Sequence, residues 1–230
     1  MAVLRNSSEL LAERQYLRSG ETEISERAFN LIIGGVLLWG FLVNYVMVTA
    51  FGPQIIRMVE SMGVIPFLIG YFVLVIAGSV MISNGGAVMS FVGYNLIALP
   101  IGVVVCACVD GVPMGVVKSA VLVTAIVTLS FMILSTLFPG FFLSLGRVLG
   151  LSLIIAIVSE LVTLLIFHRV SPIYEWAFVV IFSLYIGYDW ARANTCARTV
   201  DNAIDLAASL YLDIINLFLR ILEIMSKRKD

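Results

Sequence analysis

The sequence predicts an all-α membrane protein. Hydrophobic residues make up 61% of its 230 residues and charged residues only 13%, whereas charged residues supply about a quarter of a typical soluble domain. Apolar runs long enough to cross a bilayer as helices recur along the chain. These observations exclude a soluble domain. This composition also leads us to expect no nucleic-acid partner, whereas the net charge of −1 is uninformative about partners because the few charges lie mostly in tails and loops.

Six apolar runs are predicted to be transmembrane helices. The bilayer core needs about 20 apolar residues, and a helix satisfies its own backbone hydrogen bonds where water is absent. The glycines at positions 85 and 86 follow Asn84 and predict a tight turn between two antiparallel helices. The six runs cover residues 28–51, 63–83, 86–108, 115–137, 146–167 and 172–191.

A seventh run, residues 203–224, is long enough to cross a bilayer but contains charged residues. At 100° per residue, its strongly polar residues lie within an arc of about 80°. A charge at the bilayer centre costs at least about 2.5–3.5 kcal/mol, so we expect this face to point inward. We therefore predict a seventh helix buried among the others, with a re-entrant or half-inserted helix as the alternative. The polar face contains Asn202, Asp205, Ser209, Asp213, Asn216, Arg220 and Glu223.

The predicted organisation is a polar N-terminal tail (1–27), a seven-helix transmembrane domain (28–225) and a charged C-terminal tail (226–230). The first 27 residues contain no apolar core, so we expect no cleavable signal peptide. Basic residues occur at both ends of the chain, and seven crossings would place those ends on opposite sides of the membrane. The distribution of charge therefore does not fix the topology.

Asp189 and Asp213 are candidates for a buried acidic pair. Consecutive helices joined by a short loop are usually antiparallel neighbours. Asp213 lies farther along the chain from the middle of loop 192–202 than Asp189 does, so the two aspartates meet if the loop takes up part of this difference. Two poorly solvated carboxylates tend to share a proton. When deprotonated, they offer oxygens that suit Ca²⁺, with Asn216 and Asn202 as further ligands. Our hypothesis is that protons and Ca²⁺ compete for this pair.

Two segments resemble the paired signatures of the Bax inhibitor-1 family, also called transmembrane BAX inhibitor motif proteins. They are FSLYIGYDW (182–190) and SLYLDIINLF (209–218), whose aspartates lie 24 positions apart. The resemblance implies a seven-transmembrane-helix bundle with a central C-terminal helix. It also implies an aspartate dyad at Asp189 and Asp213, which in the family is associated with a pH-sensitive calcium leak.

One departure from the family concerns an arginine. Bacterial members can carry an arginine near the end of the second helix that binds the dyad, but the matching segment here, SVMISNGGAV (79–88), has no basic residue. Ser83 and Asn84 offer only neutral hydrogen bonds. The segment therefore supplies no arginine for a latch of that kind.

The predicted function is a pH-sensitive calcium leak channel, with Ca²⁺ as the permeant or bound ion and Asp189 and Asp213 as its ligands. The alternative is a non-conducting stress or cell-death regulatory membrane protein that acts through partners. In another interpretation, the carboxylates only bond helices together through hydroxyl groups. Residues expected to support the pair are Asn216, Ser209, Asp205, Tyr188 and Glu160, the last being either a further cation ligand or a residue satisfied by its neighbours.

No recognisable catalytic motif supports an enzyme. The single histidine, His168, and three separate cysteines offer no set typical of a hydrolase or a zinc site. An intramembrane aspartyl protease is only half matched, because Tyr188 precedes Asp189 but no glycine precedes Asp213. We expect no enzyme activity and no tightly bound cofactor, with the lipid bilayer, Ca²⁺ and protons as partners. The small loops favour a bacterial cell membrane, with the endoplasmic reticulum as the alternative.

Overall fold

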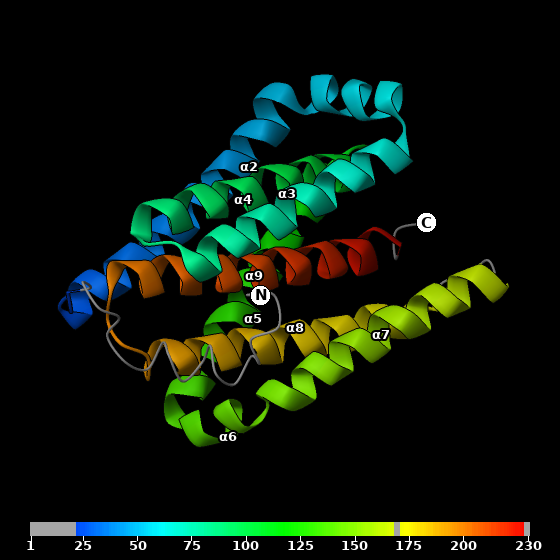
Figure 1. Ribbon diagram of the computed structural model, residues 1–230. Coiled ribbons are helices and arrows are strands. Elements are labelled where there is room, and N and C mark those ends of the chain that lie inside the picture. The colour runs from blue at the N-terminus through cyan, green and yellow to red at the C-terminus, as the bar shows by residue number, and fades with distance from the viewer. Residues whose placement is uncertain (1–21, 168–170, 228–230) are drawn as a thin grey trace. The chain divides into compact units, whose positions relative to one another are not determined.

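The computed structural model describes residues 22–167 and 171–227, and these residues contain eight helices (Figure 1). Most of the two predicted tails and His168 lie outside the described residues. The helices are α2 (Glu26–Met62), α3 (Val64–Asn84), α4 (Ala87–Val109), α5 (Met114–Leu137), α6 (Pro139–Ser144), α7 (Gly146–Phe167), α8 (Pro172–Ala193) and α9 (Val200–Lys227).

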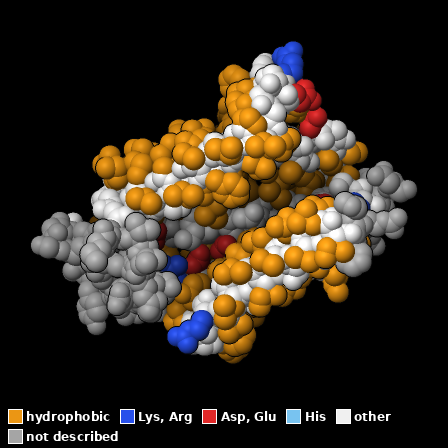
Figure 2. All heavy atoms as spheres, turned by 45° about the vertical axis from the view of Figure 1, so that its right-hand side comes forward, with side chains coloured by type: hydrophobic (Ala, Val, Ile, Leu, Met, Phe, Trp, Pro, Cys, Tyr) orange, Lys and Arg blue, Asp and Glu red, His pale blue; other side chains and the backbone are white. Residues whose placement is uncertain are grey.

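Five of these helices are long and apolar enough to cross a membrane, namely α2, α3, α4, α5 and residues Gly146–Ile166 of α7. Large hydrophobic side chains are exposed along them, and hydrophobic atoms dominate the described surface seen in Figure 2. This pattern suits a surface in contact with lipid tails. The all-α membrane class is confirmed. The count of seven transmembrane helices stays a prediction, because α8 and α9 are not among these five.

Two boundaries differ from those predicted. Helix α2 continues through Pro53 to Met62, well past the predicted end at residue 51. Its last part is a more polar segment that contains Arg57 and Glu60, and a prediction from hydropathy does not include such a segment. It stops at Gly63, whose φ of 84° favours glycine. The short helix α6 was not predicted, and Pro139 stands in its first turn, where a missing N–H does no harm.

The described chain falls into two compact units. The first contains residues 22–107 and 193–208, and the second contains residues 108–167, 171–192 and 209–227, so α9 contributes to both. The prediction that residues 28–225 form one domain stays a prediction.

Close backbone contact defines the first unit. Helices α3 and α4 form the predicted hairpin, in which a Cβ atom added to Gly78 would lie 2.5 Å from the carbonyl oxygen of Gly93. Two hydrogen bonds tie α2 to α4: Tyr94 donates to the carbonyl of Val36 at 3.0 Å, and the Trp39 indole donates to Asn95 at 2.9 Å.

The second unit holds α8 against α5, α6 and α7. Ser135 of α5 donates to the carbonyl oxygen of Gly187 at 2.5 Å, and the Trp190 indole donates to Thr136 at 3.1 Å. The ring of Phe142 in α6 occupies the space where a side chain at Gly187 would lie. These contacts fix α8 just before and just after Asp189.

Candidate functional site

Asp189 and Asp213 lie together in the second unit, on α8 and α9. Both are buried, with exposures of 5% and 8%, and their carboxyl groups come within hydrogen-bonding reach of each other. Tyr185, one turn before Asp189 on α8, lies close enough to interact electrostatically with both. The structure therefore brings together the two carboxylates that the sequence paired.

Asp213 contains an unsatisfied oxygen atom. Its Oδ2 is buried and has no hydrogen-bond partner among the described residues. A buried acceptor without a partner costs about 1–3 kcal/mol, and more when it is charged. A bound proton or cation would remove this cost.

Arg192 is a residue of the site that the sequence interpretation missed. Its Nη1 donates to Asp189 Oδ1 at 2.8 Å, one turn along the same helix, and its guanidinium lies 5.7 Å from the centre of the Tyr188 ring. An acid and a base three positions apart on a helix are neighbours, so the sequence could have indicated the ion pair between Asp189 and Arg192. In contrast, Asn84 bonds to the carbonyl of Val80 on its own helix and belongs to the first unit.

The predicted supporting residues differ in what they contact, and Tyr188, next to Asp189 in the chain, lies close enough to interact with it electrostatically. The Asn216 amide donates to the carbonyl of Leu212 on its own helix at 2.8 Å. The Tyr188 ring packs against Gly146 of α7, and Ser209 is half-buried. Asp205 is buried but belongs to the first unit.

Glu160 also binds elsewhere than at the pair. Its two carboxylate oxygens accept from Arg220 at 2.9 and 3.1 Å, a bidentate geometry that is among the stronger ionic contacts in proteins. Of the two options left open for Glu160, the structure therefore favours satisfaction by a neighbouring helix.

Glu160 is part of a larger group of charges, which we call the Arg220 cluster. Arg220 also donates to Glu175 at 3.0 Å, and its guanidinium lies 4.0 Å from the centre of the Phe178 ring. Lys227 lies 3.4 Å from Glu175 and 2.6 Å from Glu223. The cluster comprises Glu160 of α7, Glu175 of α8, and Arg220, Glu223 and Lys227 of α9.

The two charged sites lie at matching positions along α8 and α9. Fourteen positions separate Glu175 from Asp189, and the same number separates Asp213 from Lys227, which is about 21 Å of helix in each case. Because Glu175 lies beside Lys227 and Asp189 lies beside Asp213, α8 and α9 run antiparallel with matched spacing. The Arg220 cluster and the aspartate pair are therefore separate sites on one helix pair.

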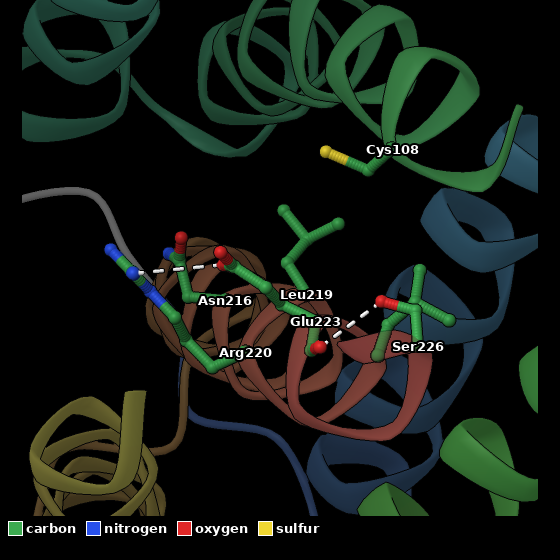
Figure 3. Close-up of a pocket in the computed structure, with 7 residues that line it drawn as sticks. Cys108, Asn216, Leu219, Arg220, Glu223 and Ser226 are labelled. Atoms are coloured by element: carbon green, nitrogen blue, oxygen red, sulfur yellow. Dashed lines mark hydrogen bonds and ion pairs between the residues drawn. The ribbon is translucent and has the colours of Figure 1, made fainter. Parts of the chain in front are cut away.

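A cavity of about 340 Å³ adjoins the Arg220 cluster. Figure 3 shows Arg220 and Glu223 side by side on α9, with Cys108 across the cavity and the guanidinium extending away from it. Within residues 22–167 and 171–227, no three His, Cys, Asp or Glu side chains form a group that could hold a metal ion. The lining residues are Cys108, Asn216, Leu219, Arg220, Leu222, Glu223 and Ser226.

Comparison with known families agrees with the paired signatures around Asp189 and Asp213. Residues 22–230 match the family described as "Inhibitor of apoptosis-promoting Bax1". The chain belongs to the Bax inhibitor-1 family. Since the match covers almost the whole chain and five helices suit a bilayer, this Bax inhibitor-1 family member is an integral membrane protein.

Two curated relatives come from Helicobacter pylori, strains 26695 and J99. Each is 36% identical to this chain over 91 residues, which is 38% of this chain and 37% of the relative. Both carry the description "Uncharacterized protein". The matched part spans little more than a third of each relative's length, so these relatives show sequence similarity without assigning an activity.

Proposed function

We propose that this Bax inhibitor-1 family protein is a pH-sensitive calcium leak channel without enzymatic activity, in which Asp189 and Asp213 bind protons or Ca²⁺ in competition. The observation that carries the proposal is the contact between two buried carboxyl groups, one of which has an oxygen atom without a hydrogen-bond partner among the described residues. Such a pair gains from binding a positive charge.

Proton binding follows from the charges of the pair. Two adjacent carboxylates repel each other when both are ionised, and the repulsion is stronger where water is scarce. A proton held between them removes one charge and supplies a donor. The pair then titrates as one unit, so an apparent midpoint belongs to both residues.

Calcium binding needs more oxygen atoms than the pair provides. Ca²⁺ takes about 6–8 oxygen ligands, and the two carboxylates supply at most four of them. Backbone carbonyls and water would supply the rest, as is common where an ion passes through and is not stored. A site with few protein ligands suits weak binding and rapid release, which conduction requires.

Arg192 adjusts the charge that the pair presents. With both carboxylates ionised, Asp189, Asp213 and Arg192 together carry one negative charge. A positive group 2.8 Å from Asp189 keeps that carboxylate ionised at a lower cost. We propose that Arg192, which lies on α8 together with Asp189, acts in place of the arginine that segment 79–88 lacks.

A bacterial cell membrane is the proposed location, since both curated relatives described above are bacterial proteins. If the source were eukaryotic, the endoplasmic reticulum membrane would be the corresponding place. Expression of a tagged chain in each host, followed by membrane fractionation, tests this part of the proposal.

Calcium flux into proteoliposomes tests the proposed activity. The purified protein is reconstituted at a fixed protein-to-lipid ratio, and dye-reported Ca²⁺ entry is measured across a series of pH values. We expect flux that depends on pH in the native protein, and loss of that dependence in Asp189→Asn and Asp213→Asn. Asp110→Asn, which removes an exposed carboxylate, is the matched control and should behave as the native protein.

Two results would contradict the proposal in different ways. Unchanged flux in both dyad variants would remove the aspartate pair from the mechanism. Native protein that gives no more flux than empty liposomes at every pH would instead favour the non-conducting regulatory function.

A further inference from the structure

Helix α7 has an unusual distribution of side chains over most of its length. From residue 150 to residue 166, none of its side chains is buried. Its outer positions are mostly leucine, isoleucine and valine, whereas the face turned toward the unit is small and polar. The half-buried residues on that face are Gly150, Ser152, Leu153, Ala156, Ser159, Glu160 and Thr163.

The environment of a membrane helix decides what this pattern means. Lipid tails are as apolar as leucine, so the exposed apolar face provides no force that holds α7 against its neighbours. Packing of small residues and polar contacts must do so instead. The outer half of α7, by which we mean residues 156–166, therefore depends on a few identifiable interactions for its position.

Those interactions involve two residues of neighbouring helices. The Tyr174 hydroxyl of α8 bonds with the Thr163 hydroxyl at 2.7 Å and donates to the carbonyl of Ser159 at 3.2 Å. Arg220 of α9 holds Glu160 through both carboxylate oxygens. Of these, the ionic contact is the one that ties α7 to α9.

The N-terminal end of α7 is held in place differently. Gly146 lies so close to the Tyr188 ring that an added Cβ would be 2.7 Å from it, and Leu149 is only 2% exposed. This end is fixed by close packing against α8. Helix α7 therefore has one packed end and one end held by polar contacts.

We propose that Arg220 is an electrostatic latch that closes the outer half of α7, residues 156–166, onto α9, and that release of the latch lets this half of the helix separate. The proposal is independent of calcium flux, because it concerns the position of α7 alone.

The charges around Arg220 give the latch a distinctive signature. Arg220 stands between Glu160 and Glu175, which come from different helices. When the guanidinium is removed, Glu160 loses its counter-ion and faces Glu175, which keeps Lys227 beside it. The repulsion between the two carboxylates then favours separation of the helices. Removing Glu160 as well takes away one of the repelling charges. The double variant should therefore be less open than the Arg220 variant alone.

Hydrogen–deuterium exchange of the protein in lipid nanodiscs measures the opening. In Arg220→Gln, peptides that cover residues 156–166 should exchange about tenfold faster, a change of about 1.4 kcal/mol, because the hydrogen bonds from the charged guanidinium are lost. Glu160→Gln should give a smaller increase, and Arg220→Gln with Glu160→Gln should fall below Arg220→Gln alone. Lys118→Gln, which removes an exposed positive charge, should leave the exchange of these peptides unchanged.

Peptides from residues 97–106 of α4 serve as an internal control for the integrity of the fold. If these peptides also exchange faster in Arg220→Gln, the variant has unfolded, and Glu160→Gln alone decides the question. Native exchange of residues 156–166 in Glu160→Gln would then overturn the latch. In a folded Arg220→Gln protein, native exchange there would overturn it as well. Faster exchange of residues 156–166 in the double variant than in Arg220→Gln would also overturn the latch, because the effects of the two substitutions would then simply add.

Discussion

Arg192 contacts Asp189 across one turn of α8, with 2.8 Å between Nη1 and Oδ1. The arginine side chain is partly exposed, whereas the aspartate is buried beside a second carboxylate. The guanidinium therefore connects a buried acidic pair to a more accessible part of the second unit. This arrangement makes Arg192 a positive charge beside the pair with which a proton or a metal ion would compete.

Arg192→Gln should change the pH at which the proposed calcium flux responds. A positive group beside a carboxylate favours its ionised form, so removing that group makes the pair hold a proton more tightly. The midpoint of the flux curve should move to higher pH by about 1–3 units. Arg192→Lys keeps the charge and should shift the midpoint less. A native midpoint in Arg192→Gln would show that the guanidinium does not act on the pair.

Gly187→Ala should destabilise the protein near the aspartate pair. The Phe142 ring occupies the space that the new Cβ needs, and overpacking of this kind typically costs about 1–3 kcal/mol. The midpoint of thermal unfolding in detergent should fall. Gly115→Ala is the matched control, because nothing lies within 4 Å of its added Cβ. Equal midpoints for the two variants would mean that α6 and α8 adjust freely.

Ser90→Ala should destabilise the first unit. Ser90 is fully buried, and its hydroxyl donates to the buried carboxylate of Asp201 at 2.5 Å. Loss of this donor leaves a charged acceptor less well satisfied, at a cost of about 1–3 kcal/mol. Ser79→Ala removes an exposed hydroxyl that bonds only to its own helix at Val75 and should have little effect. The same thermal measurement distinguishes the two, and a Ser90→Ala protein as stable as the native one would contradict this account.

Much of the helical framework follows from hydropathy alone. Long apolar runs predict α3, α4, α5 and α7 with ends close to those observed, because a bilayer requires such runs. The same argument fails at α2, which continues into polar sequence after residue 51. Hydropathy measures where a chain is apolar, whereas backbone hydrogen bonds decide where a helix ends.

The polar face of α9 was predictable, but its partners were not. A period of 3.6 residues places Asp205, Asp213 and Arg220 on one face. The structure assigns Asp205 to the first unit, Asp213 to Asp189, and Arg220 to Glu160 and Glu175. Which acid meets which base depends on how the other helices pack, and a single helical period carries no information about that. Asp189 could be paired with Asp213 from the sequence because each lies in one of the two family signatures.

Calcium titration of the purified protein at several pH values tests the central proposal most directly. If protons and Ca²⁺ compete for Asp189 and Asp213, the apparent dissociation constant for Ca²⁺ should rise as the pH falls, and Asp213→Asn should abolish both the binding and its dependence on pH. Calcium binding that is equally strong at every pH, or that survives unchanged in Asp213→Asn, would contradict the account.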